Sequence, residues 1–237
     1  MTHRSVLAAL FSLFILAFGA SSAFAAPTQK GTPYVRMDKD QAVVLLVDHQ
    51  TGLFSLVQDF EPMEFKNNIL ALGATAKHFN VPVVLSTSLK DGPNGPLLPE
   101  IRAMFPEAPL IERHGQINAW DNEDFRKAVE QTGRKQVIIA GIVTDVCVSC
   151  LSLSMAEAGY DVFVVVDASG TFNEAVRHAA WDRMSANGIQ LVNWFTVACE
   201  LQRDWRNDME GLANILHQYM PAYGNLIDSQ NHTNSNN

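Results

Sequence analysis

The sequence has few basic residues and few cysteines. Its 17 Lys and Arg residues are outnumbered by 25 Asp and Glu residues, so the formal net charge is −8, and no stretch is rich in Lys or Arg. A nucleic-acid partner is not expected, because phosphate binding requires a basic footprint. Three cysteines are too few for a scaffold built on disulfides, so each needs its own explanation.

Motifs that would indicate a cofactor or a metal are also missing. The first apolar run ends at Asp48 without a Gly-x-Gly-x-x-Gly turn, which argues against a nicotinamide or flavin site. The absence of Gly-x-Ser-x-Gly excludes the nucleophile elbow of serine α/β-hydrolases. Cys147 and Cys150 have neither a second Cys pair nor a His pair at zinc spacing. We therefore expect no cofactor and no metal.

Apolar residues are abundant, at 47% against 18% charged residues, which excludes a disordered chain. Part of this content lies at the N-terminus, where Arg4 precedes an apolar run from Val6 to Ala20 and an Ala-x-Ala sequence ending at Ala25. This pattern predicts a signal peptide, residues 1–25, and export to a bacterial periplasm or medium. A membrane anchor is the alternative, but the run is shorter than the roughly 20 residues of a spanning helix. After cleavage no membrane contact is expected.

Residues 26–228 are predicted to form one α/β domain. Short runs rich in Val, Ile and Leu alternate with segments of helical periodicity, and such runs are typical of parallel strands covered on both faces. The predicted strands are Ala42–Val47, Val81–Ser86, Pro109–Glu112, Val137–Ile142, Val162–Val166 and Gln190–Phe195. They indicate a doubly wound, mostly parallel six-stranded sheet with helices on both faces. Polar residues 229–237 are interpreted as a disordered tail.

In open α/β sheets, ligands bind beyond the carboxyl ends of the strands, which is where Asp48, Arg113 and Cys147 fall. Cys147 should open a helix, whose dipole favours the nucleophilic thiolate and whose free amides can bind an oxyanion. A buried core cysteine is the alternative. A Cys-x-x-Cys redox pair with Cys150 is another reading.

Asp48 and Arg113 also have more than one interpretation. Asp48 could activate a thiol, bind ribose or a metal, or cap the next element. Arg113 could lower the pKa of a neighbouring thiol, hold a carboxylate, or simply be a solvated surface residue. Lys90 is a rival cation, but the Gly- and Pro-containing segment 90–96 predicts an exposed turn.

Together, Asp48, Arg113 and the segment Gly141–Cys147 resemble the isochorismatase-like cysteine hydrolases, in particular their YcaC-type branch, whose substrate is undefined. The resemblance covers Thr32 to Leu226. Its distinctive stretches are residues 45–50, 92–97, 117–125, 167–174 and 198–205.

The resemblance implies a catalytic triad of Asp48, Cys147 and a lysine whose position is taken here by Arg113. Arginine cannot lose its proton, so Arg113 can serve only as an electrostatic clamp. The resemblance also implies a cis peptide at Val143–Thr144 and an oxyanion hole formed by the amides of Val143 and Cys147. The family's nicotinamidases carry an Asp-x-His metal cluster, which is missing here, so nicotinamide hydrolysis is not expected.

The resulting hypothesis is a periplasmic cysteine amidohydrolase that cleaves a C–N bond of a small amide through an acyl-enzyme. Asn118, Trp120 and Phe172 are candidate pocket residues, with ordinary packing as the alternative. The resemblance also implies a homo-oligomer, of which an octamer is one form. The competing hypotheses are a redox-responsive Cys-x-x-Cys protein and an oligomeric protein with vestigial activity.

Overall fold

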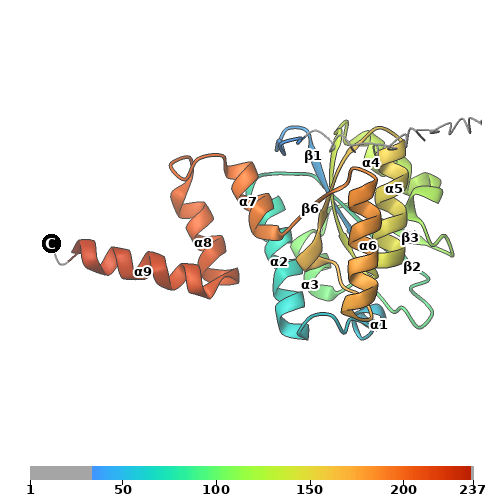
Figure 1. The fold of residues 1–237 in the computed structure, drawn as a ribbon, viewed down its shortest axis with the longest axis horizontal. Helices are drawn as coiled ribbons and strands as arrows, with labels where there is room; N and C mark the ends of the chain where they lie inside the picture. The colour runs from blue at the N-terminus through green and yellow to red at the C-terminus, as the bar shows by residue number, and fades with distance from the viewer. Residues whose placement is uncertain (1–33, 236–237) are drawn as a thin grey trace, which may run out of the picture. The chain divides into compact units, whose positions relative to one another are not determined.

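The computed structural model describes residues 34–235, so the predicted signal peptide lies outside the described residues. A single six-stranded sheet runs through the domain (Figure 1). Its strands are β1 (Ala42–Val47), β2 (Val83–Ser88), β3 (Leu110–Arg113), β4 (Gln136–Gly141), β5 (Asp161–Val165) and β6 (Gln190–Val192). All neighbouring strands are parallel, in the order β3-β2-β1-β4-β5-β6. The predicted α/β fold is confirmed, and the sheet is entirely parallel.

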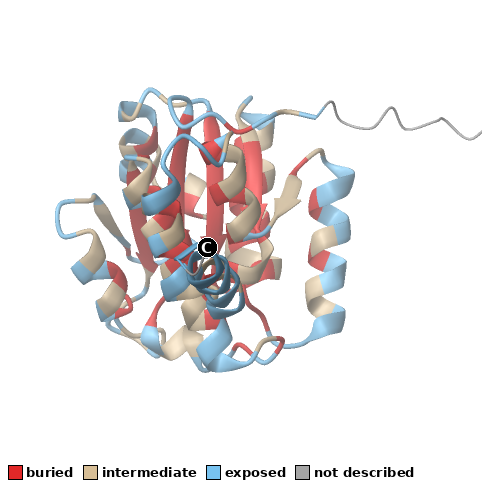
Figure 2. Ribbon diagram, turned by 90° about the vertical axis from the view of Figure 1, so that its left-hand side faces the viewer, coloured by how far each residue is buried: buried red, intermediate tan, exposed pale blue. Residues whose placement is uncertain are grey.

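Helices cover both faces of the sheet. One layer contains α2 (Pro62–His78), α3 (Pro99–Met104) and α7 (Trp194–Gln202), and the other contains α4 (Glu123–Gln131), α5 (Ser149–Glu157) and α6 (Glu174–Ala186). Successive residues of β1 alternate between the layers: Leu46 packs in the core of the α2 layer and Leu45 in the core of the α5 layer. Every residue of β1 and β4 is therefore buried, as Figure 2 shows for the central strands.

The remaining elements are short turns and two C-terminal helices. They are α1 (Thr51–Phe54), the 3₁₀ turns η1 (Ala119–Asp121) and η3 (Val166–Ala168), the π-helical turn η2 (Thr144–Val148), α8 (Met209–Tyr219) and α9 (Pro221–Ser235). Between residues 34 and 235, no helix has the length and apolar character needed to cross a membrane.

Two predictions for the C-terminal part of the chain are wrong: the end of the sixth strand and the disordered tail. Trp194 and Phe195 do not extend the sixth strand but begin α7, because the Asn193 side chain accepts a hydrogen bond from the Thr196 amide and caps the helix. Residues 229–235 are not a disordered tail but the end of α9. That helix is held by the His217–Asp228 contact of 2.9 Å and by Tyr223, which packs 5.9 Å from the Phe195 ring.

The sheet has its topological switch point between β1 and β4. The strands β2 and β3 follow on one side of this pair, and β5 and β6 follow on the other. Val47 and Gly141 are paired at the carboxyl ends of β1 and β4. Asp48 follows the first of them and the loop leading to Cys147 follows the second. The candidate residues therefore lie where ligand sites form in this class of sheet.

Gly141→Ala should destabilise the fold at this switch point. A Cβ at residue 141 would lie 2.4 Å from the Val47 carbonyl oxygen, so β1 and β4 would have to separate. We expect a loss of roughly 1–3 kcal/mol in the free energy of unfolding, measured by urea denaturation. Gly115→Ala is the matched control, since nothing lies within 4 Å of the corresponding position and its stability should not change.

Candidate functional site

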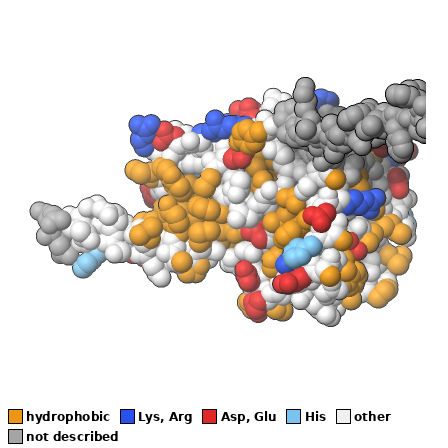
Figure 3. All heavy atoms as spheres, viewed as in Figure 1, with side chains coloured by type: hydrophobic (Ala, Val, Ile, Leu, Met, Phe, Trp, Pro, Cys, Tyr) orange, Lys and Arg blue, Asp and Glu red, His pale blue; other side chains and the backbone are white. Residues whose placement is uncertain are grey.

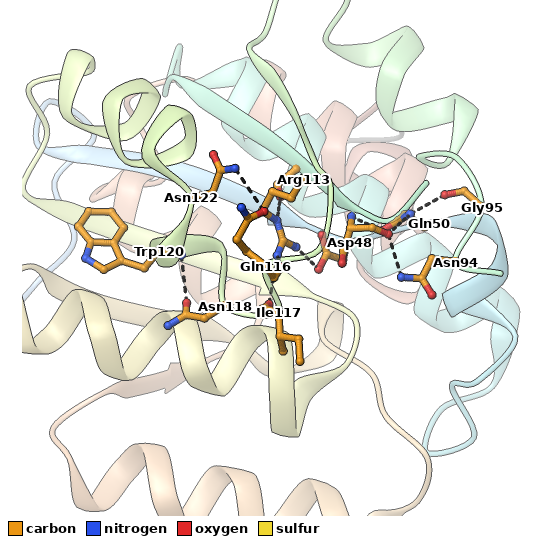
Figure 4. Close-up of polar contacts among 12 residues, drawn as sticks. Asp48, Gln50, Asn94, Gly95, Arg113, Gln116, Ile117, Asn118, Trp120 and Asn122 are labelled. Carbon is orange, nitrogen blue, oxygen red and sulfur yellow. Dashed lines mark hydrogen bonds and ion pairs between the residues drawn. The ribbon is translucent and has the colours of Figure 1, made fainter. Parts of the chain in front are cut away.

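Arg113 is the largest fully buried side chain of the described residues, with a relative exposure of 1%. Its guanidinium forms an ion pair with Asp48 Oδ2, and its Nε donates to Ser86 Oγ at 2.9 Å. The third nitrogen donates to the backbone carbonyls of Gln116 and Ile117 (Figure 4). The interpretation of Arg113 as a solvated surface residue is therefore wrong. All three of its nitrogens are committed to the protein.

Asp48 lies directly after β1 and is fully buried. Its backbone has a φ of 60°, a left-handed conformation that turns the chain sharply at the strand end. Arg113 occupies Oδ2, while Oδ1 makes no hydrogen bond of ordinary geometry within the described residues. Cys147 and Ser86 lie within reach of the carboxylate and lower its pKa, as does Arg113, but burial outweighs them and raises it overall.

Cys147 lies in the first turn of a continuous helical segment. This segment begins at Thr144 with the π-helical turn η2 and continues as α5, so it starts three residues earlier than expected. Cys147 is partly buried, and the cysteines of the described residues are free thiols. The N-terminal position predicted for the candidate nucleophile is confirmed, although Cys147 itself does not open the helix.

The thiol of Cys147 is a weaker acid than the helix position suggests. Burial and the neighbouring Asp48 carboxylate raise its pKa to about 12, whereas the Val143 backbone amide and the Arg113 charge lower it. The helix start was expected to favour the thiolate, whereas desolvation and the adjacent negative charge favour the neutral thiol. The resting pair is a neutral thiol beside a carboxylate.

The cis peptide lies one residue before the predicted position. It joins Ile142 and Val143, not Val143 and Thr144. The Val143 carbonyl accepts from Val148 N at 3.2 Å inside the turn, whereas the Thr144 amide donates outward to the Gly170 carbonyl at 3.1 Å. These opposite directions fit a trans peptide at Val143–Thr144.

The loop that carries Cys147 is braced by the segment 170–172. Thr171 Oγ1 donates to Asp145 Oδ1 at 2.6 Å, which ties this segment to η2. The Thr171 amide in turn donates to Asp59 Oδ1 at 2.8 Å, and the Asp59 carbonyl accepts from Arg177 at 2.8 Å. Arg177 also lies between the rings of Phe60 and Trp181. Sequence reasoning missed this brace, because its partners come from three distant parts of the chain.

The segment 90–96 contains the predicted turn, and buried side chains hold it in place. Gln50, which is fully buried, bonds both backbone groups of Ser88, at 2.8 and 3.0 Å. Asn94 donates to the same Ser88 carbonyl at 2.8 Å. These contacts close the segment over the ends of β1 and β2, as the right-hand part of Figure 4 shows. Lys90 remains at the surface, where it pairs with Glu112 at 2.6 Å.

The three weaker candidates have different surroundings. Asn118 caps η1 through the Trp120 amide at 3.0 Å and donates to Ser154 Oγ at 2.9 Å. Trp120 packs edge-on against Tyr160, 5.7 Å away, and Figure 4 shows its ring on the side of Asn118 away from Asp48. Phe172 is 40% exposed, next to the Thr171–Asp145 contact. Ile117, which sequence reasoning did not select, is exposed beside Arg113.

His49 is a fully buried residue that directly follows Asp48 in the chain. Its Nε2 donates to the Ala168 carbonyl at 2.9 Å, and its Nδ1 is buried without a partner in the described part of the chain. Burial lowers the pKa of His49 to about 4. The ring is therefore neutral at pH 7. Among residues 34–235, no group of three His, Cys, Asp or Glu side chains is arranged to hold a metal ion.

Two replacements of Arg113 should distinguish how much its charge and its hydrogen bonds each contribute to stability. Arg113→Met leaves the Asp48 carboxylate buried without a cation and should cost about 3–5 kcal/mol in the free energy of unfolding. Arg113→Lys should cost less, because it keeps the charge but cannot reproduce the planar set of bonds to Ser86, Asp48 and the loop carbonyls. Urea denaturation measures both, and Lys90→Met, at the surface, should leave stability nearly unchanged. Equal stability of Arg113→Met and the unmodified protein would contradict the buried pair.

The neutral state of His49 predicts a pH dependence of stability. Because its pKa is about 4 in the folded protein and 6.5 ordinarily, the unfolded chain binds a proton that the folded chain rejects between these values. The free energy of unfolding should therefore fall by up to about 3 kcal/mol as the pH drops from 7 to 4. In urea titrations, His49→Gln should remove this part of the slope, whereas His114→Gln, at the surface, should retain it.

Comparison with known proteins places this geometry in a family. The isochorismatase domain model matches residues 42–195. Over 197 residues, covering 83% of this chain and 95% of the relative, the chain is 64% identical to the Escherichia coli protein named "Probable hydrolase YcaC".

Two solved structures share the fold at the same level of identity. YcaC from Pseudomonas aeruginosa, solved with hexane-2,5-diol and covalent acrylamide, matches with a TM-score of 0.83 and 64% identity, over 84% of this chain and 98% of that chain. YcaC from Escherichia coli, described as an octameric hydrolase of unknown specificity, has the same TM-score and identity over 85% and 98%. The chain therefore belongs to the isochorismatase family of hydrolases, in its YcaC-type branch.

Proposed function

We propose that this hydrolase is a cysteine amidohydrolase, which cleaves the C–N bond of a small amide through an acyl-enzyme on Cys147. One observation carries the proposal. At the switch point of the sheet, a neutral thiol lies beside a carboxylate whose pKa is raised by burial, and the buried Arg113 holds that carboxylate in place. This arrangement combines a nucleophile with a base that is fixed in position.

The first step follows from the two pKa directions. A thiol with a pKa of about 12 is not a thiolate at pH 7, so its proton must leave as the nucleophile attacks. Asp48 is the acceptor: Arg113 occupies Oδ2, which leaves Oδ1 to take the proton. Its raised pKa makes it a stronger base than an ordinary carboxylate. The Cys147 sulfur then bonds to the amide carbonyl carbon, and the carbonyl π electrons move to oxygen.

The remaining steps transfer the proton to the leaving nitrogen and regenerate the free enzyme. The amide of Val143, which already hydrogen-bonds the thiol, and the amide of Cys147 stabilise the oxyanion. Collapse of this intermediate breaks the C–N bond, and protonated Asp48 gives its proton to the leaving nitrogen. Water attacks the resulting thioester while Asp48 accepts one of its protons. The carboxylic acid leaves, and Cys147 recovers its hydrogen.

The substrate class follows from what surrounds these residues. Arg113 is 1% exposed and directs four of its five N–H donors to Asp48, Ser86 and two carbonyls, so it is not available as the binding partner of a substrate carboxylate. Two exposed side chains on the adjoining loops are apolar, Ile117 beside Arg113 and Phe172 beside Thr171, and their exposed neighbours Gln116 and Asn173 are uncharged. These features favour an uncharged small amide. Covalent acrylamide in the Pseudomonas aeruginosa relative is consistent with this, since acrylamide is both a small amide and a thiol-reactive electrophile.

The proposal includes export and self-association. The apolar segment and Ala-x-Ala sequence at the N-terminus support removal of residues 1–25 during export to a periplasm or medium. The octameric state of the Escherichia coli relative, at 64% identity, supports a homo-oligomer of this chain.

Thiol labelling tests the nucleophile. Treated with acrylamide and followed by intact-mass and peptide mass spectrometry, Cys147 should react faster than Cys199, whose pKa is raised by burial alone. Asp48→Asn should slow the labelling of Cys147 by about 10²–10⁴-fold. The same intact masses report the N-terminus: a start at Ala26 supports export, and a start at Met1 contradicts it.

Turnover completes the test. In a panel of small amides and N-carbamoyl compounds, Cys147→Ala should abolish any hydrolysis, with circular dichroism confirming that the variant is folded. Labelling of Cys147 no faster than that of Cys199 would refute the nucleophile. Hydrolysis that survives Cys147→Ala, or a panel in which no member is cleaved, would favour vestigial activity. A Cys147–Cys150 disulfide in the isolated protein, found by counting thiols under denaturing conditions, would favour the redox alternative.

A further inference from the structure

The turn η2, which carries Cys147, is joined to the rest of the domain at Thr171. This threonine is fully buried, and each of its polar backbone and side-chain groups has a partner. Its hydroxyl donates to Asp145 Oδ1 of η2 at 2.6 Å, and its amide donates to Asp59 Oδ1 at 2.8 Å. Its carbonyl accepts from the Gln58 amide at 2.9 Å. Thr171 therefore links the turn of the proposed nucleophile to a separate anchor around residue 59.

That anchor is itself firmly held. The Asp59 side chain has no exposed surface and pairs with Arg177 at 3.6 Å, and the Asp59 carbonyl accepts from the same guanidinium at 2.8 Å. The guanidinium lies 5.1 Å from the ring centroid of Phe60 and 4.9 Å from that of Trp181. Arg177 also pairs with the exposed Glu174 at 3.5 Å, on α6, over which Figure 3 shows acidic and histidine side chains. Thr171 is thus fastened to a fixed carboxylate.

The backbone beside Thr171 holds the peptide groups that precede the nucleophile. The Thr144 amide donates to the carbonyl of Gly170 at 3.1 Å. The Val143 carbonyl, which belongs to the same peptide group, accepts from two amides of η2 at 3.2 and 3.3 Å. This peptide group is therefore held at both of its polar ends. The Val143 amide, one peptide group earlier, hydrogen-bonds the Cys147 thiol, so a shift at residue 171 would reach the thiol through this backbone.

We infer that Thr171 is a positioning residue for the reaction of Cys147. Its hydroxyl bond to Asp145, two residues before the nucleophile, holds η2 where the thiol can pass its proton to Asp48. The inference rests on the cysteine hydrolase activity proposed above. Thr171 has no exposed surface with which to touch a substrate, so it acts only through the groups it holds. Misplacing reacting groups by 1 Å can cost about 10²-fold in rate.

The rate of acrylamide addition to Cys147, followed by peptide mass spectrometry of the whole protein, tests this role. Thr171→Val removes the hydroxyl with little change of shape and should slow the addition by about 10–10²-fold. Thr171→Ser restores a hydroxyl and should recover most of the rate. Thr75→Val is the matched control, because Thr75 is equally buried and its hydroxyl donates to the Ala71 carbonyl at 2.9 Å within α2. It loses the same kind of bond and should react at the unmodified rate.

The pH profile of the addition distinguishes positioning from a loss of stability, which urea denaturation measures for each variant. While Asp48 accepts the proton, the rate should be nearly constant between pH 8 and 9.5, because a thiol with a pKa of about 12 contributes little thiolate there. In Thr171→Val the thiol no longer meets Asp48, so only thiolate reacts. Its rate should then rise by about tenfold per pH unit. Thr75→Val should keep the flat profile.

An unchanged rate in Thr171→Val, slowing with a flat profile, equal slowing in Thr75→Val, or no recovery in Thr171→Ser would overturn the positioning role. Asp48→Asn distinguishes this from failure of the proposed function. If it labels as fast as the unmodified protein, the proposed base is wrong and the role falls with it. If it is slowed while Thr171→Val is not, only the positioning role is wrong.

A second pair of variants tests the same bond from its other end. Should circular dichroism show that Thr171→Val is unfolded, Asp145→Ala removes the acceptor and should reproduce the slowing and the pH dependence. Asp145→Asn keeps an acceptor oxygen and should retain most of the rate. Equal rates in these two variants would overturn the positioning role.

Discussion

The buried ion pair of Asp48 and Arg113 organises this end of the sheet. The two residues follow β1 and end β3, so the arginine side chain crosses the end of the intervening strand β2, where it bonds Ser86. Burying two charges costs several kcal/mol per ion, which their attraction repays only when the remaining donors are also satisfied. Here the loop carbonyls of Gln116 and Ile117 accept two more of the guanidinium N–H groups. One side chain thereby fixes three strand ends and a loop.

This constraint explains the state of the proposed nucleophile. Had the helix dipole dominated, Cys147 would rest as a thiolate, as in sites that pair a cysteine with a cation. Here the Arg113 guanidinium pairs with Asp48, and it lowers the pKa of Cys147 less than the Asp48 carboxylate raises it. The neutral thiol is therefore favoured in the resting protein.

The central sheet could be predicted from sequence because its signals are local. The bounds of β1 match the prediction at both ends, since Ala42–Val47 is an uninterrupted apolar run between polar residues. The sixth strand was predicted too long because apolar residues such as Trp194 and Phe195 are compatible with both a strand and a helix. Only the Asn193 cap decides between the two. Composition also misled at the C-terminus, where a polar, Asn-rich segment is helical in the structure.

The candidate site also has a part that the sequence predicts and a part that it does not. Asp48, Arg113 and Cys147 could be brought together in advance, because parallel strands place their carboxyl ends at one edge. Ser86 as a partner of Arg113, and the brace from Asp59 through Thr171 to Asp145, could not, since hydrogen bonds between residues up to 112 positions apart leave no periodic trace.

Sheet topology thus fixes which chemical groups meet, while the loops determine what surrounds them. The loops that carry Ile117 and Phe172 are held from within, the first by the Arg113 guanidinium and the second by Thr171, yet both present apolar side chains to the outside. A change in either loop can alter the entrance without disturbing the buried pair, because the contacts that hold the loops use backbone carbonyls and the neighbouring threonine. One buried centre combined with different surrounding loops is the expected outcome of that division.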